Sequence, residues 1–177
     1  MRTLFIPALL ALIAPPLLAD PVTGPVVENF GPTWSVPEGS FNLESDQVYR
    51  VVMDVARAPE DENSPSRAIE SAARFLNLHA RNGIRPDQLQ LAVVLHGPAA
   101  AAALDDAGHQ RLFGTANASK ALIQALDAAG VTIYLCGQTA AYRGYPPAEL
   151  LPEIKLAVSA MTVHVRLQQE GYRAILF

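Results

Sequence analysis

Short apolar, strand-like runs alternate with segments of helical periodicity along most of this chain, and this alternation limits the possible folds more than any other feature. Strands are expected at residues 49–55, 89–95, 131–135, 154–157 and 172–176, and helices at 66–83, 99–105, 118–129 and 161–169. The strands are continuous apolar runs without polar alternation, so both of their faces should be buried. The sequence therefore predicts an α/β protein with three α/β/α layers around a five-stranded, mainly parallel sheet.

Residues 1–19 have the pattern of a secretory signal peptide. Arg2 supplies a positive charge, residues 4–18 are apolar, and Ala19 is a small residue before Asp20. The apolar run is too short for a membrane-spanning helix and contains the pair Pro15–Pro16. We expect cleavage near Ala19 and a periplasmic or secreted mature protein without a membrane span.

Residues 20–46 are rich in proline and glycine, which predicts an extended arm rather than a regular helix or a long strand. The arm also carries apolar side chains, at Val26, Val27, Phe30, Trp34, Val36 and Phe41. It can bury them either on its own domain or on another subunit, and the sequence favours neither. The α/β domain is expected to occupy residues 47–177.

The composition excludes several classes of function. A formal net charge of -4 is not the positive face that nucleic acid binding requires. A single cysteine excludes an intramolecular disulfide and cysteine-rich metal centres. The chain contains no glycine-rich phosphate loop, which argues against a nucleotide cofactor. We expect no cofactor and no resident metal.

In open parallel sheets, ligands bind beyond the carboxyl ends of the strands. The residues expected there are 54–57, 96–98, 136–139 and 159–161. Cys136 is the candidate nucleophile or sulfur acceptor, because a thiol near a helix N-terminus is favoured as the thiolate. Gly137 permits close backbone approach, and Thr139 can cap the following turn. The alternative is that Cys136 is a small buried core residue.

The four histidines differ in their expected surroundings. If the second and third strands are neighbours, the ring of His96 can reach Cys136 and lower its pKa. Alternatively, His96 forms hydrogen bonds only within a turn. His79 and His164 fall within predicted helices and are expected to be surface or packing residues. A metal site made from His96, His109 and Cys136 lacks any diagnostic spacing.

Four segments, taken in order and spacing, resemble the DsrE/DsrF-like sulfur-relay superfamily. They are Val51–Val55, Leu91–Gly97 with its ending Leu-His-Gly, Gly130–Thr139, and Leu167–Tyr172. The resemblance covers about residues 47–177 and leaves the arm outside.

This resemblance implies a small α/β/α domain that assembles as homo-oligomers, often trimers or hexamers, and exchanges sulfur with donor and acceptor proteins. It implies that Cys136 accepts sulfur as a persulfide, and this is the only residue role that it carries over. Our first hypothesis is therefore a periplasmic carrier, more than an enzyme with turnover, in which Cys136 holds the sulfur. His96 would assist, and Gly97, Gly137, Gln138 and Thr139 would line the sulfur site. The best-known relay members are cytoplasmic, whereas this chain carries an export signal.

Two other functions remain open at this point. One is a noncatalytic homo-oligomeric module of the same fold that binds a small ligand or a protein segment. The other is a structural oligomer in which the arm clasps a neighbouring subunit.

Overall fold

The computed structural model describes residues 20–36 and 42–177. Five strands form one sheet in the order β4-β3-β2-β1-β5, and every neighbouring pair is parallel. The strands are β1 (Tyr49–Val55), β2 (Leu89–Leu95), β3 (Thr132–Cys136), β4 (Ile154–Ala157) and β5 (Arg173–Leu176). This arrangement confirms the predicted fold class.

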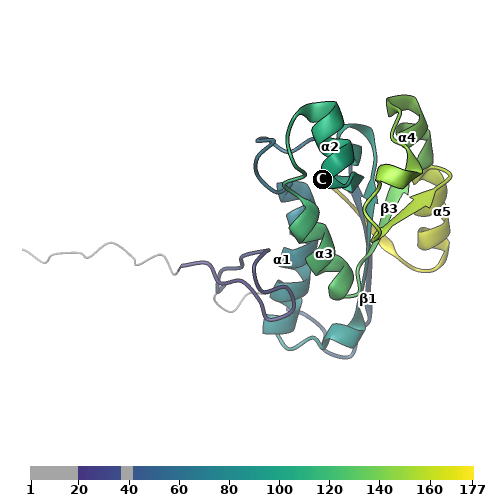
Figure 1. Ribbon diagram of the computed structural model, residues 1–177. Helices are drawn as coiled ribbons and strands as arrows, with labels where there is room; N and C mark the ends of the chain where they lie inside the picture. The colour runs from purple at the N-terminus through teal and green to yellow at the C-terminus, as the bar shows by residue number, and fades with distance from the viewer. Residues whose placement is uncertain (1–19, 37–41) are drawn as a thin grey trace, which may run out of the picture.

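Helices cover both faces of the sheet (Figure 1). In that view α1 and α3 lie on one face, α5 lies on the other, and α2 and α4 stand at the carboxyl ends of the strands. The α-helices are α1 (Arg67–Arg81), α2 (Asp106–Phe113), α3 (Lys120–Ala128), α4 (Gly137–Arg143) and α5 (Ala160–Gln169). The described residues also include three short 3₁₀ helices: η1 (Pro86–Gln88), η2 (Gly97–Ala103) and η3 (Pro147–Glu149).

The alternation of side chains along each strand divides the core in two. Val51, Met53 and Val55 belong to a large cluster that also holds residues of α1 and α3. The intervening Val52 belongs to a smaller cluster that also contains Cys136 and residues of α5. Burying an aliphatic side chain of this size contributes about 1.5–3 kcal/mol, so the larger cluster supplies most of the packing energy. Cys136 therefore lies on the more thinly covered face of the sheet.

Three local predictions differ from the structure. The alanine-rich segment predicted as a helix at residues 99–105 is instead the 3₁₀ helix η2. Helix α2 was not predicted, although Asp105 caps it by accepting a hydrogen bond from the Gly108 amide. Helix α4, where only a turn was expected, begins directly at the end of β3. Both missed helices are short, and short helices form through tertiary packing more than through their own propensity.

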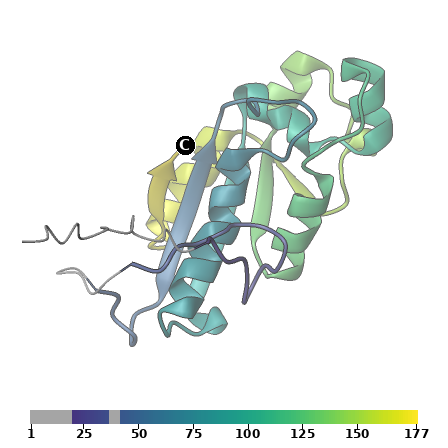
Figure 2. The same ribbon diagram turned by 90° about the vertical axis from the view of Figure 1, so that its left-hand side faces the viewer.

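Residues 20–36 of the predicted arm lie on their own domain. The side chain of Asn77 on α1 is fully buried and accepts hydrogen bonds from the amides of Val26 and Val27. It also donates to the carbonyls of Val27, Phe30 and Gly31. Figure 2 shows this segment passing beside the α1 side of the sheet. Of the two alternatives for the arm, the structure shows packing on its own domain.

No helix among residues 20–36 and 42–177 is long and apolar enough to cross a membrane. The predicted signal peptide, residues 1–19, lies outside the described residues. Phe41 of the predicted arm also lies outside them.

Candidate functional site

The carboxyl ends of three neighbouring strands bring chemically active side chains together on the α5 face of the sheet. Leu95 of β2 is paired with Leu135 of β3, so His96 and Cys136 occupy the next position on adjacent strands. On the other side of β2, the amide of His96 donates to the carbonyl of Val55 at the end of β1. The second and third strands are therefore neighbours in the sheet, as the prediction for His96 requires.

Asp54, near the end of β1, holds two imidazole rings on one carboxylate oxygen. Its Oδ1 lies 3.0 Å from Nε2 of His96 and 2.6 Å from Nε2 of His164. Because an ionised carboxylate accepts but does not donate, each Nε2 carries the proton. In the neutral rings, Nδ1 is therefore left as a proton acceptor. The carboxylate fixes both the tautomer and the orientation of His96 at the strand end.

The prediction for His164 was wrong, whereas the one for His79 is confirmed. His79 stacks on Phe75 with ring centroids 3.8 Å apart and serves packing. His164 instead contacts Asp54, which is 110 residues away in the sequence. One signal was available, because His164 continues the helical spacing of Ala160, Val163 and Leu167, the buried residues of α5. The sequence places Asp54 at the end of a strand, but it carries no local sign that this carboxylate binds two histidines.

Cys136 is the N-cap residue of α4 and is only 6% exposed. Burial raises the pKa of its thiol, but the Thr139 hydroxyl and the backbone amides of Ala160, Thr139 and Gln138 together lower it by more. The pKa therefore lies below its ordinary value. These amides belong to the first turns of two helices, α4 and α5, where unpaired N–H groups favour an anion.

The other predicted site residues hold this arrangement in place. The Gly97 amide donates to Oγ1 of Thr139 across 3.3 Å, which ties the end of β2 to α4. That bond leaves the hydroxyl proton of Thr139 available to the sulfur. The side chain of Gln138 donates to the carbonyl of Val158, while its backbone amide faces the thiol. Gly137 lies so close to β4 that an added Cβ would stand 2.4 Å from the carbonyl oxygen of Ala157.

The site therefore offers a thiol whose thiolate form is favoured by backbone amides and the Thr139 hydroxyl. The ring of His96, at the end of the neighbouring strand, is held by Asp54 rather than by this thiol. Such a thiolate can act as a nucleophile or accept a sulfur atom. Within residues 20–36 and 42–177, no three His, Cys, Asp or Glu side chains are arranged to hold a metal ion. His109, the third ligand of the metal site considered from the sequence, lies on α2 and lines a different pocket.

Comparison with known proteins gives the family. The model of the DsrE/DsrF-like family matches residues 50–177. The chain belongs to the DsrE/DsrF-like family. Two solved structures share its fold: the protein of unknown function MTH1491 from Methanobacterium thermoautotrophicum and the ychN protein from E. coli.

MTH1491 is 22% identical to this chain, with a TM-score of 0.55, and the match covers 73% of this chain and 99% of MTH1491. The ychN protein is 19% identical, with a TM-score of 0.53 and the same coverage of both chains. A search of the curated proteins gave no significant match. At these identities, the two structures establish the fold of this DsrE/DsrF-like chain.

Replacing Thr139 by valine is expected to raise the pKa of Cys136. The change preserves the shape of the side chain but removes a hydroxyl that lowers this pKa. A thiol with a lowered pKa becomes a thiolate at a lower pH, so losing the donor moves the thiolate curve to higher pH. The rate of iodoacetamide alkylation, measured from pH 5 to 10, should therefore fall in Thr139→Val at every pH below the plateau. Thr139→Ser keeps the donor and serves as the control; equal profiles for all three proteins would contradict this role of Thr139.

Proposed function

We propose that this DsrE/DsrF-like protein is a periplasmic sulfur carrier in which Cys136 holds a persulfide. The observation that supports this most is the lowered pKa of Cys136 between the first turns of α4 and α5. A persulfide anion needs the same stabilisation as a thiolate, and backbone amides supply it without a mobile counter-charge. Membership of the DsrE/DsrF-like family is consistent with this chemistry.

The transfer step is redox-neutral overall. The Cys136 thiolate attacks the outer sulfur of a donor persulfide, R–S–SH, so that a new S–S bond forms on Cys136. The S–S bond of the donor breaks, and the donor leaves as the thiolate R–S⁻. An acceptor thiolate then attacks the outer sulfur on Cys136 and restores the Cys136 thiolate. His96 ends the neighbouring strand with its ring oriented by Asp54, and in this proposal it turns toward the sulfur to exchange a proton with the leaving thiolate.

An alternative function is a noncatalytic homo-oligomeric binding module, and exposed apolar side chains near the site favour self-association. Tyr142 on α4 is 89% exposed, and Val158, Met161 and Val165 beside or on α5 are 75%, 76% and 58% exposed. Large apolar groups at this density on neighbouring elements are typical of interaction surfaces. We propose that copies of the chain assemble there, which is compatible with either function.

Intact mass spectrometry of protein exported with its own leader tests the carrier function. Reduced protein is treated with sodium tetrasulfide, so that the Cys136 thiolate takes one sulfur and releases trisulfide. The expected product is heavier by about 32 Da, the mass of one sulfur atom, and dithiothreitol should remove the addition. The mass of the untreated protein also shows whether the mature chain begins at Asp20, and native spectra give its oligomeric state.

Cys136→Ser is the matched control, because the sequence contains no other cysteine. The variant should keep its oligomeric state and take up no sulfur. A native wild-type protein that gains no sulfur, while the urea-unfolded protein does, would contradict the carrier function. Cys136 would then be a core residue, and the binding module would be the better description.

A further inference from the structure

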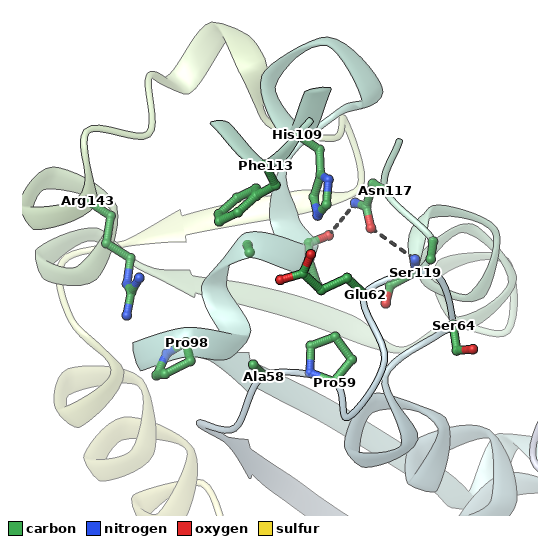
Figure 3. Close-up of a pocket in the computed structure, with 13 residues that line it drawn as sticks. Ala58, Pro59, Glu62, Ser64, Pro98, His109, Phe113, Asn117, Ser119 and Arg143 are labelled. Carbon is green, nitrogen blue, oxygen red and sulfur yellow. Dashed lines mark hydrogen bonds between the residues drawn. The ribbon is translucent and has the colours of Figure 1, made fainter. Parts of the chain in front are cut away.

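A pocket lies between the β1–α1 loop, η2, α2 and the end of α4 (Figure 3). Its volume is about 160 Å³, and Cys136 does not line it. Its apolar walls come from Pro59, Pro98 and Phe113. Neither the family match nor the proposed sulfur chemistry assigns a role to this pocket.

His109 is a buried group with one nitrogen free for a ligand. His109 is 8% exposed, and its Nδ1 lies 2.8 Å from the carbonyl oxygen of Thr115. A carbonyl only accepts, so Nδ1 carries the proton and Nε2 of the neutral ring is an acceptor. Figure 3 shows the ring pointing into the pocket. Among the described residues, Nε2 has no hydrogen-bond partner.

Asn117, which also lines the pocket, is held in place by hydrogen bonds to the backbone. Its amide donates to the carbonyls of Ala102 and Leu104, and its Oδ1 accepts from the Ser119 amide. All of these bonds hold the protein together, so Asn117 has little capacity left for a ligand. This part of the wall is therefore fixed, and the groups that bind a ligand must be sought elsewhere around the pocket.

Two opposite charges complete the pocket. Figure 3 shows Glu62 projecting into its middle from the β1–α1 loop and Arg143 standing at another side, on the last residue of α4. Within the described residues, neither side chain belongs to an ion pair. A carboxylate and an imidazole acceptor suit an ammonium group, whereas a guanidinium suits a carboxylate. A purely anionic ligand would meet repulsion from Glu62.

We propose that this pocket binds a small zwitterion of amino-acid size. Its ammonium group would donate to Glu62 and to Nε2 of His109, and its carboxylate would pair with Arg143. Its apolar body would pack against Phe113 and the two prolines. The volume has room for on the order of ten water-sized groups, which is below the range of pockets for larger ligands. This binding does not depend on sulfur transfer at Cys136.

Titration with L-leucine and two matched analogues tests the proposal. The analogues are 4-methylpentanoate, which lacks the ammonium group, and 3-methylbutylamine, which lacks the carboxylate. Binding is followed by calorimetry and by the imidazole ¹⁵N resonances of the whole mature protein, with His109 assigned through His109→Gln. Leucine should shift the His109 Nε2 resonance, and each analogue should bind at least about tenfold more weakly, because one charged hydrogen-bonded contact is lost.

The leucine affinity of single-residue variants shows whether the ligand binds in this pocket. Glu62→Gln and Arg143→Gln should each weaken leucine binding by about tenfold or more for the same reason. Glu60→Gln and Arg67→Gln are matched controls, because these exposed residues line a neighbouring pocket and should leave the affinity unchanged. Binding of 4-methylpentanoate as tight as that of leucine would overturn the proposal in favour of an anion site. A His109 resonance that none of the three compounds moves would overturn it altogether.

Discussion

Replacing Asn77 by aspartate is expected to detach the arm from α1 and to lower the free energy of unfolding by about 3 kcal/mol or more. The native amide donates to the carbonyls of Val27, Phe30 and Gly31 from a fully buried position. In the variant, these carbonyls face an oxygen that cannot donate. Leaving several buried polar groups unpaired, or burying an unpaired charge beside them, is among the most costly single changes in a protein.

Chemical denaturation measures the loss of stability, and Trp34 reports on the arm itself. Trp34 is the sole tryptophan of the chain and lies on the arm, where it is 52% exposed. Its emission should therefore lose anisotropy, rather than change colour, when the arm is released and moves freely. Asn82→Asp is the control. Asn82 has an exposed side-chain bond to the Leu78 carbonyl, and its loss should cost less than about 1 kcal/mol. Unchanged stability and anisotropy in Asn77→Asp would show that these five hydrogen bonds do not hold the arm.

Replacing Gly137 by alanine is expected to destabilise the protein by about 2 kcal/mol and to slow the reaction of Cys136. The new Cβ would stand 2.4 Å from the carbonyl oxygen of Ala157 and 3.3 Å from that of Val158. Both atoms belong to the backbone, so relief requires α4 to move away from β4. That movement withdraws the amides of Gln138 and Thr139 from the thiol, raises its pKa and reduces the thiolate fraction at neutral pH.

Denaturation and alkylation rates measured on the same samples separate the two effects. Gly144→Ala is the control, because Gly144 ends the same helix with φ +67° but has open space around its Cβ position. It should lose stability by about 1–2 kcal/mol from the left-handed backbone, while its alkylation profile stays that of the wild type. If Gly137→Ala alkylates at the wild-type rate, the close packing of α4 on β4 does not set the reactivity of Cys136.

The sequence by itself determined the elements with strong local signals and the position of the thiol. The apolar runs predicted the strands, and Ser66, which accepts a hydrogen bond from the Ile69 amide, marked the start of α1. The predicted end of the third strand placed Cys136 and residues 137–139 at the carboxyl edge of a parallel sheet. These features depend on periodicity and capping within a few residues, which a single sequence displays directly.

Only the tertiary structure decided which distant residues meet. The order of the strands, the two histidines on Asp54, the arm on Asn77 and the amide of Ala160 at Cys136 join residues that lie between 21 and 122 positions apart. Short helices such as α2 and α4 depend on the same packing. Such contacts produce no periodic pattern in the sequence, because the partners come from distant segments. They form only when the helices pack on the sheet and the buried polar groups need hydrogen-bond partners.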